Sequence, residues 1–311
     1  MTDGLAVELS AVVVAVTGGE PRVLTIDDGE ALPSGPLESD HRTLELGLRA
    51  WVQASTGLTL GYVEQLYTFA DRARITEGGQ RLVSLSYLAL TRETPPNPLD
   101  GPPGVRWSPW RWYFPWEERR GKAGEAAAQA LAELLVAWSE AAPDAATGRA
   151  RRQRVLLAFG LDGAPWNEDL TLQRYELLYE AGLVAEALRD EGREAEAPPE
   201  SGKAMAHDHR RILATGVSRL RAKIKYRPVV FELLPAAFTR LQLQQTVEAL
   251  AGRGVHKQNF RRLIDQQGLI EDTGEIASDT GGRPAKLARF RSEVLLERAA
   301  AGTRLPVARG R

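Results

Sequence analysis

The sequence predicts an α+β protein with more than one domain. Two observations place strands at the start of the chain and helices in its middle: apolar, β-branched runs come first, and alanine- and leucine-rich stretches with helical spacing follow. A third observation is a pair of strand-like runs beside short helices near the C-terminus. With 311 residues, of which 43% are hydrophobic, the chain can bury more than one core.

The first part of the chain is predicted to form strands around a single helix. Three apolar runs have strand character, at residues 5–16, 21–27 and 80–91. Between the second and third runs, residues 42–55 carry apolar side chains at helical spacing, and Gly57 follows as a stop signal. We therefore expect an α+β domain over residues 1–117.

The middle of the chain is predicted to be an added helical segment over residues 118–200. Three stretches separated by prolines have helical composition and spacing, at residues 125–141, 151–159 and 170–189. An aromatic cluster precedes them, and a buried seam between subdomains is the commoner use of such a cluster, with a ligand or partner surface as the alternative. Its members are Trp107, Trp110, Trp112, Tyr113, Phe114 and Trp116.

Residues 201–227 are predicted to form a helix that connects two domains. Asp208 is an acidic residue at the helix start, and an apolar stripe runs along one face up to the stop before Pro228. The stripe consists of Leu213, Val217, Leu220 and Ile224. His207 and His209 point to different sides and the chain has no cysteine, so we expect no metal site here.

Residues 228–311 are predicted to form a winged helix-turn-helix domain. Thr239 can cap a first helix, a glycine-containing turn follows, and a second helix begins near His256. The sequence Gly281-Gly282-Arg283-Pro284 then forms a turn between two strand-like runs. These runs are residues 268–275 and 285–290.

The second helix of this domain has a polar, basic face. We expect an inward face of Phe260, Leu263, Ile264 and Gln267, and an outward face of Lys257, Gln258, Arg261, Arg262 and Asp265. A recognition helix in the major groove uses Arg or Lys for guanine edges and Asn or Gln for adenine edges, although Asn259 could instead be a cap. Arg283, held by Pro284, suits a minor groove or a phosphate. The residues expected to contact DNA are Thr239, Gln242, Lys257, Gln258, Asn259, Arg261, Arg262, Arg283 and Lys286.

Charge is distributed unevenly along the chain. The formal net charge is −1, but residues 201–311 contain 21 Lys and Arg against 10 Asp and Glu, which leaves 19 against 31 for residues 1–200. Because nucleic-acid affinity comes largely from cations at phosphates, the basic C-terminal part favours a polyanionic partner. A solvated basic surface, or attraction between the domains, would produce the same count.

Residues 5–115 resemble a Nudix domain in their order of strand, glycine loop, helix and glycine. Nudix enzymes hold magnesium against a diphosphate with an Arg-Glu pair and a Glu-Glu pair on that helix. When the helix is aligned on Gly57, the glutamate positions are occupied by Trp51, Ala54 and Ser55, and Ala50 stands in place of the arginine. Such side chains cannot supply the hard oxygen ligands that magnesium needs. The resemblance therefore implies a Nudix-like α/β/α sandwich without its metal site.

Two alternatives concern this emptied site. A displaced metal site could use Glu38, Asp40 and Glu45, but acidic residues near a helix start are more often simply solvated. A Nudix-like fold can also keep a nucleotide-sized cleft after catalysis is lost, because concave pockets are where small molecules usually bind. We expect the second outcome, a sensor domain.

A further resemblance is to the Nudix-related transcriptional regulators of NAD metabolism. The run Glu64-Gln65-Leu66-Tyr67-Thr68-Phe69 is similar to theirs, and so is the chain from about residue 228 onward. The matching segments there include Phe231-Glu232-Leu233-Leu234-Pro235, Asn259-Phe260-Arg261-Arg262 and Gly282-Arg283-Pro284-Ala285. About ninety residues separate two motifs that lie close together in the family, which implies a helical insertion, as in a longer branch.

This resemblance implies a nucleotide effector related to NAD, namely ADP-ribose, NAD or ATP. The candidate ligand contacts are Arg49, Tyr67 and Phe69, although Tyr67 and Phe69 are otherwise typical core aromatics on a strand. The resemblance also implies a homodimer on a palindromic operator.

The sequence favours a DNA-binding transcriptional regulator of NAD biosynthesis or salvage genes, with repression as the favoured mode. We expect no catalytic residue, metal or cofactor. The alternatives are a Nudix pyrophosphatase acting on ADP-ribose or a dinucleotide, and an adaptor that binds protein through its winged helix. The longest apolar run, residues 11–16, is too short for a signal or a membrane span, so we expect a cytoplasmic protein without membrane contact.

Overall fold

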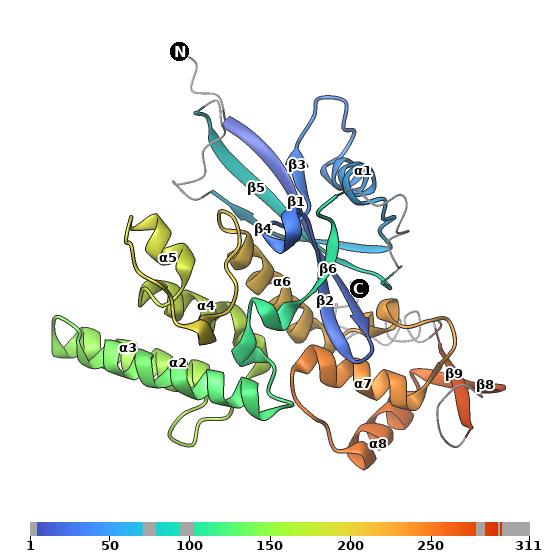
Figure 1. Ribbon diagram of the computed structural model, residues 1–311. Coiled ribbons are helices and arrows are strands. Elements are labelled where there is room, and N and C mark those ends of the chain that lie inside the picture. The colour runs from blue at the N-terminus through green and yellow to red at the C-terminus, as the bar shows by residue number, and fades with distance from the viewer. Residues whose placement is uncertain (1–4, 71–78, 94–102, 278–283, 292, 294–311) are drawn as a thin grey trace, which may run out of the picture.

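The computed structural model describes residues 5–70, 79–93, 103–277, 284–291 and 293. It contains a six-stranded sheet with helices on both faces, a helical segment beside it, and a small C-terminal domain (Figure 1). This arrangement confirms the predicted fold class, a Nudix-like α/β/α sandwich with a helical insertion and a C-terminal winged helix. None of the helices described has the length and apolar composition that crossing a membrane requires.

The large sheet has the strand order β4-β5-β1-β2-β6, and β3 also pairs with β1. β1 runs parallel to β5, and the other pairs are antiparallel. The strands are β1 (Leu5–Thr17), β2 (Glu20–Thr25), β3 (Ser34–Pro36), β4 (Tyr62–Phe69), β5 (Arg81–Leu90) and β6 (Arg106–Pro109). The three predicted runs are β1, β2 and β5. β3 and β6 were not predicted, because three or four residues are too few to show a pattern.

One face of the sheet is covered by α1 (Leu44–Thr56). The Thr43 hydroxyl caps its first turn, and Gly57, with a φ of 73°, ends it as predicted. A small core lies between this helix and the sheet. It consists of Leu9, Ala11, Val13, Leu24, Leu48, Val52, Leu60, Tyr87 and Ala89.

The opposite face of the sheet is covered by α6 (His209–Ile224). Gly216 permits a close approach, because a Cβ at this position would lie only 2.8 Å from the Val12 side chain. This helix is therefore the second helical layer of the sandwich, and not only the connection that the sequence predicted. The core beneath it continues into the helical segment and the C-terminal domain.

The helical segment consists of α2 (Lys122–Glu140), α3 (Ala145–Phe159), α4 (Thr171–Glu180) and α5 (Ala185–Asp190). The sequence predicted one helix where α4 and α5 stand. That prediction is wrong, because Gly182 adopts a left-handed φ of 68° and turns the chain between them. Helices α2 and α3 form a long hairpin at the side of the molecule (Figure 1).

Most of the aromatic cluster lies where the sheet meets the helical segment, but Trp107 packs against the small core on the α1 side. Trp110, Tyr113, Phe114 and Trp116 are buried, as predicted for a seam, whereas Trp112 is 41% exposed. Short 3₁₀ helices form part of this stretch and of several connections: Asp27–Gly29, Trp110–Trp112, Pro115–Glu117, Glu168–Leu170, Pro199–Ser201 and Val229–Leu233.

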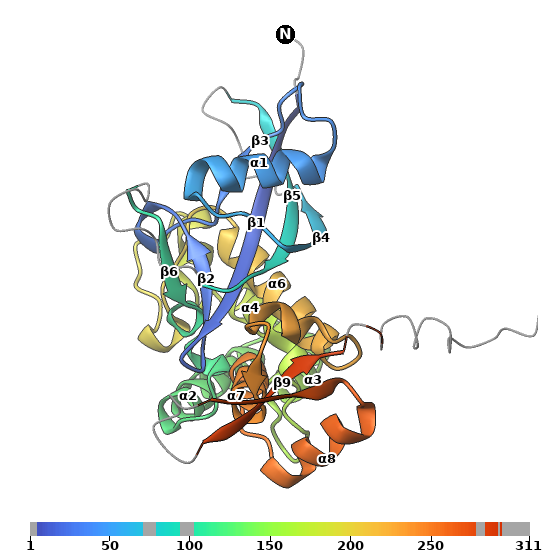
Figure 2. The ribbon, with the colours of Figure 1, turned by 90° about the vertical axis from the view of Figure 1, so that its right-hand side faces the viewer.

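The C-terminal domain is a winged helix. Its elements are β7 (Phe238–Thr239), α7 (Arg240–Ala251), α8 (Lys257–Gln267), β8 (Ile270–Ala277) and β9 (Ala285–Phe290), and its sheet has the order β7-β9-β8. Phe231, in the 3₁₀ helix before β7, stacks on Phe290 with ring centroids 4.3 Å apart. The helix α8 lies at the opposite end of the molecule from α1 (Figure 2).

Candidate nucleic-acid interface

The helix α8 presents most of its polar side chains to solvent. Phe260 and Ile264 face the core of the domain, and Gly268 ends the helix with a φ of 57°. The exposed residues include Lys257, Gln258, Asn259, Arg261 and Arg262, all predicted DNA contacts. Asn259 lies inside the helix, so it is not the N-terminal cap; His256 holds that position.

The buried stripe of α8 is narrower than predicted. Leu263 is 49% exposed and Gln267 is also exposed, although both were expected to face inward. Only the side of α8 that carries Phe260 and Ile264 packs against the domain core, which leaves the flanking positions in solvent. The exposed face therefore contains an apolar side chain beside its cations.

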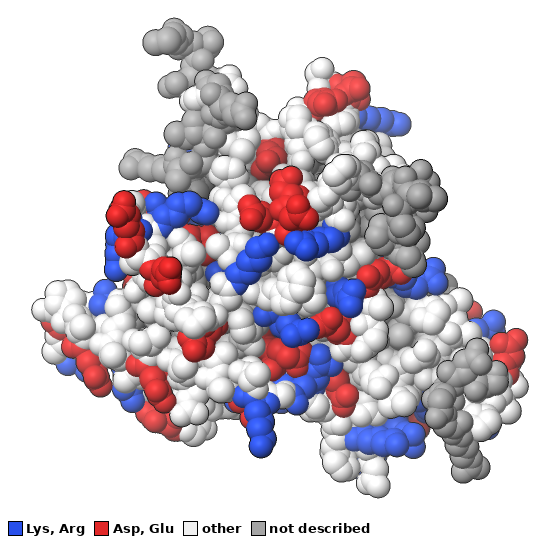
Figure 3. Space-filling model, in the orientation of Figure 1, with Lys and Arg blue, Asp and Glu red and all other residues white. Residues whose placement is uncertain are grey.

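The charges of α8 are arranged to favour an anion. Its one acidic residue, Asp265, pairs with Arg240 at the start of α7. In the part of the chain that the structure describes, Lys257, Arg261 and Arg262 form no ion pair. Basic side chains are visible over the C-terminal domain, with acidic ones also on this face (Figure 3). Unpaired cations of this kind are available for phosphates.

Two of the predicted DNA contacts, Thr239 and Gln242, form a helix cap. The Thr239 side chain is buried, and its hydroxyl accepts a hydrogen bond from the Gln242 amide nitrogen at 3.1 Å. The Gln242 side-chain oxygen in turn accepts from the Thr239 amide nitrogen at 2.7 Å. This reciprocal capping box satisfies two amide groups at the start of α7. The structure thus gives Thr239 a capping role, and its side chain is not at the surface.

The wing contributes one described candidate. The Lys286 side chain, on β9, is 81% exposed, and its Nζ lies 4.0 Å from an Asp272 carboxylate oxygen. Arg283 and the two glycines before it lie outside the described residues. The wing strands themselves, β8 and β9, pair antiparallel.

The helix α1 carries no metal-binding carboxylates at the positions where a Nudix enzyme has them. Trp51 packs against Gly35 of β3 so closely that a Cβ on this glycine would lie 1.8 Å from the indole ring. Ala54 is exposed, and the Ser55 hydroxyl donates to the Trp51 carbonyl oxygen at 2.8 Å. An aromatic ring, and a hydroxyl already hydrogen-bonded within its own helix, provide no ligand set for magnesium.

The possible displaced site is not assembled as the sequence suggested. Glu45 pairs with Arg49 at 2.9 Å, so it belongs to the helix surface. Glu38 and Asp40 instead lie near His41, with one ligand atom of each within 4.8 Å of the others. Both carboxylates are exposed, and exposed acidic groups commonly occur without a metal.

The three candidate nucleotide contacts do not meet in one place. The Arg49 guanidinium donates to the carbonyl oxygens of Leu60 and Gly61, at 2.5 and 3.0 Å, on the α1 side of the sheet. Tyr67 is 53% exposed and lies under the Arg219 guanidinium of α6, so it is not the core residue that its strand position suggested. Phe69 packs against the core on the α6 side.

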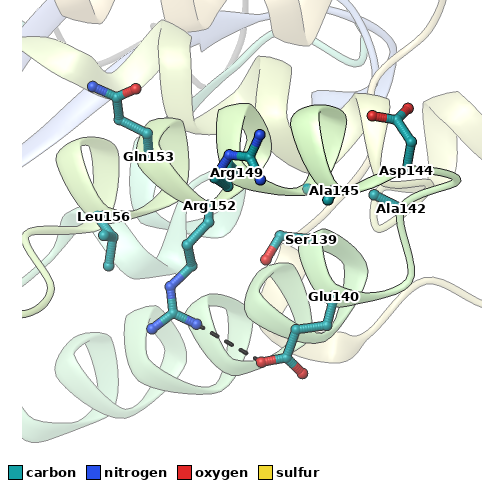
Figure 4. Close-up of a pocket in the computed structure, with 10 residues that line it drawn as sticks. Ser139, Glu140, Ala142, Asp144, Ala145, Arg149, Arg152, Gln153 and Leu156 are labelled. Atoms are coloured by element: carbon teal, nitrogen blue, oxygen red, sulfur yellow. Dashed lines mark ion pairs between the residues drawn. The ribbon is translucent and has the colours of Figure 1, made fainter.

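Two pockets lie on the helical segment. One, of about 610 Å³, is at the tip of the α2–α3 hairpin, where Arg152 reaches towards Glu140 with 3.9 Å between nitrogen and oxygen (Figure 4). The other, of about 740 Å³, lies between α2 and the end of α3. Neither is lined by a predicted ligand residue.

Three arginines that sequence reasoning missed are fully buried: Arg174, Arg210 and Arg221. Arginine is expected at the surface unless it is paired. The partners here are Glu117 for Arg174 and Arg221, and Glu186 for Arg210. Only the tertiary structure brings these residues together.

Comparison with known proteins agrees with this geometry. Residues 230–290 match the family model of the NrtR DNA-binding winged helix domain. The ADPR responsive transcriptional repressor NtrR of Acinetobacter baylyi is 35% identical over 86 residues, which are 28% of this chain and 34% of that protein. The match therefore spans about a third of the length of this relative.

Solved structures share the fold over nearly the whole chain. Shewanella oneidensis NrtR complexed with a 27mer DNA is similar with a TM-score of 0.54 at 19% identity, over 93% of this chain and 94% of that chain. A MutT/nudix family protein from Enterococcus faecalis is similar with a TM-score of 0.53 at 16% identity, over 93% and 87%. The predicted resemblance to Nudix-related regulators is confirmed.

Proposed function

We propose that this chain is a DNA-binding transcriptional repressor that responds to an NAD-related nucleotide, with ADP-ribose as the effector. The observation that carries the proposal is the exposed, unpaired basic face of α8, in a domain that matches a DNA-binding winged helix family. The name of the A. baylyi relative, an ADPR responsive repressor, supports both the mode of regulation and the effector. The regulated genes are those of NAD biosynthesis or salvage.

The output of this regulator is DNA binding by α8 in the major groove. Lys257, Gln258 and Asn259 lie in the first turn of the helix, where side chains reach base edges. Arg261 and Arg262 follow, and supply charge for phosphates or guanine edges. The chain acts as a homodimer on a palindromic operator, because two winged helices are needed to contact two half-sites.

The input is the α/β/α sandwich, acting as a binding domain without catalysis. Trp51, Ala54 and Ser55 stand where magnesium ligands are required, and the Trp51 indole fills the space next to β3. Diphosphate hydrolysis needs a metal to neutralise charge and activate water. The nucleotide therefore binds and is not consumed.

DNA binding by the full-length chain tests the proposal. A fluorescent duplex from the region upstream of its own gene is titrated with protein at several salt concentrations, with and without ADP-ribose, NAD and ATP. We expect salt-dependent affinity that ADP-ribose weakens. Absence of salt-dependent affinity would favour the adaptor, and an affinity that no nucleotide changes would remove the sensor function.

The rival pyrophosphatase activity has a direct assay. The protein is incubated with ADP-ribose and magnesium, and AMP is measured. We expect no AMP above the protein-free control. Release at rates typical of enzymes, about 1 s⁻¹ or faster, would contradict the assignment of α1 as catalytically empty.

A further inference from the structure

Three charged side chains are buried together where the sheet, the helical segment and the C-terminal domain meet. The Glu117 carboxylate accepts hydrogen bonds from Arg174, at 2.5 Å from Nε and 3.0 Å from Nη2, and also pairs with Arg221. All three side chains are 1% exposed or less. We name Glu117, Arg174 and Arg221 the buried joint.

The buried joint connects all parts of the fold. Glu117 ends the second of the two 3₁₀ helices that follow β6, Arg174 lies on α4 of the helical segment, and Arg221 lies on α6. Arg221 also reaches the winged helix, because its Nε donates to the Leu250 carbonyl oxygen in the last turn of α7 at 2.8 Å. The orientation of the winged helix is therefore fixed by the other parts.

The turn between α7 and α8 rests directly on the joint. Gly252 has a φ of 68°, and a Cβ there would lie 2.0 Å from the Glu117 carbonyl oxygen. The Gly252 carbonyl oxygen accepts a hydrogen bond from the Arg119 amide nitrogen at 2.7 Å. The next residue, Arg253, forms an ion pair with Glu168 at 3.3 Å. Because α8 begins just after this turn, a shift of the joint moves the start of the recognition helix.

The two arginines of the joint stabilise the ionised form of Glu117. Burial alone would raise the pKa of Glu117, but the charges of Arg174 and Arg221 outweigh it and lower the pKa below its ordinary value of 4.5. Arg174 also donates to the carbonyl oxygens of Ala158 and Asn167, at 2.7 and 3.0 Å. A buried ion that loses a partner is left uncompensated, so a movement on one side requires movement on the others.

The stretch that contains Glu117 is also tied to the loop between β2 and β3. The Tyr113 hydroxyl donates to the Gly29 carbonyl oxygen at 2.6 Å. In the same loop, the Leu32 amide nitrogen donates to His209 Nδ1, at the start of α6, at 3.1 Å. A displacement of this loop thus reaches the joint through one short, buried stretch of chain.

We propose that the buried joint positions the recognition helix and transmits nucleotide binding in the sheet domain to DNA. This inference rests on the proposed function, in which α8 binds DNA and the sandwich binds the effector. Glu117, Arg174 and Arg221 are positioning residues, since they act through the α7–α8 turn.

The test uses three variants of the full-length chain. Glu117→Gln removes the one negative charge of the joint and leaves its two arginines without a carboxylate. Glu168→Gln leaves the joint intact and removes the side-chain ion pairs of Glu168 with Arg253 and Lys225. The matched control is Glu186→Gln, because Glu186 is also 1% exposed and pairs with a fully buried arginine, Arg210, at 3.1 Å. Its hydrogen-bond partners are the Arg210 guanidinium on α6 and the Met205 amide nitrogen, and neither belongs to the C-terminal domain.

Two measurements are made on each variant: DNA affinity with and without ADP-ribose, and hydrogen exchange of the α7 and α8 amides. In the unmodified chain we expect ADP-ribose to weaken binding about tenfold, within the usual range for coupled sites. In Glu117→Gln and Glu168→Gln this ratio should fall towards one, and exchange in α7 and α8 should quicken. Glu186→Gln should keep both properties.

The proposal is overturned if Glu117→Gln and Glu168→Gln keep the full effect of ADP-ribose on DNA affinity and the slow hydrogen exchange of α7 and α8. It is also overturned if Glu186→Gln loses both properties to the same extent. A general loss of stability would affect the control as well. If the unmodified chain binds DNA but ignores ADP-ribose, the sensing part of the proposed function fails. In that case the hydrogen exchange of the α7 and α8 amides is the measurement that tests whether the joint positions the recognition helix. Should Glu117→Gln not fold, Glu168→Gln carries the same comparison.

Discussion

The helices α1 and α8 lie at opposite ends of the molecule and use similar residue types in opposite ways (Figure 2). On α1, the Trp51 indole packs against Gly35 and the Arg49 guanidinium bonds to the backbone that follows the helix. On α8, Arg261 and Arg262 are exposed and, among the residues described, have no carboxylate partner. A helix that occupies the place of a Nudix catalytic helix can thus serve to stabilise its own domain, while the proposed DNA contacts lie on the helix whose charges are unpaired.

The strongest test of this comparison removes the free charges of α8. Arg261→Ala and Arg262→Ala together should weaken DNA binding by roughly 2–6 kcal/mol, because each DNA contact of this kind contributes about 1–3 kcal/mol. Fluorescence anisotropy at constant salt measures the change, and the salt dependence should become shallower.

The control for this pair is Arg152→Ala with Arg154→Ala on α3. These arginines are also partly exposed, but they pair with acidic residues of the helical segment. Equal losses in both double variants would mean that net charge, and not the face of α8, determines the affinity.

The corrected inward face of α8 is tested by two neighbouring residues. Ile264→Ala should destabilise the chain by about 2–4 kcal/mol, since Ile264 is buried. Leu263→Ala should change stability by less than about 0.5 kcal/mol, because Leu263 is half exposed. Chemical denaturation measures both, and a large loss for Leu263→Ala would restore the predicted wide stripe.

On α1, Trp51→Ala should lower stability by about 1–3 kcal/mol through lost packing against β3, and leave the affinity for DNA unchanged. Leu46→Ala, on the same helix but 50% exposed, is the control and should be nearly neutral. A drop in DNA affinity at full folding for Trp51→Ala would show that α1 is not confined to its own domain.

The contribution of Glu117 in the buried joint to the stability of the chain should depend on pH. The folded-state pKa of Glu117 lies below its ordinary value of 4.5, so its stabilising contribution is present above that pH and is lost as pH falls through the folded pKa. In urea titrations below pH 5, Glu117→Gln should therefore lose stability less steeply than the unmodified chain. Parallel curves would indicate that Glu117 is not ionised in the folded protein.

Local signals in the sequence predicted local structure well. Gly57 ends α1 and Thr239 caps α7 as expected, because caps depend on neighbouring residues alone. The tertiary role of α6 was not predictable, since its apolar stripe indicates a buried face but not the Val12 side chain that meets Gly216. The same holds for the buried joint, whose members are separated by 57 and 104 residues along the chain.

One continuous core runs from the sheet through the helical segment into the winged helix. Elements that share a core tend to unfold together, so a substitution that destabilises one element destabilises all of them. A destabilising substitution deep in α2 or α4, far from α8, would then reduce the amount of intact protein that escapes proteolysis. Lower abundance would relieve regulation as effectively as a lost DNA contact. Harmful substitutions are therefore expected in the helical segment as well as on the DNA-facing surface.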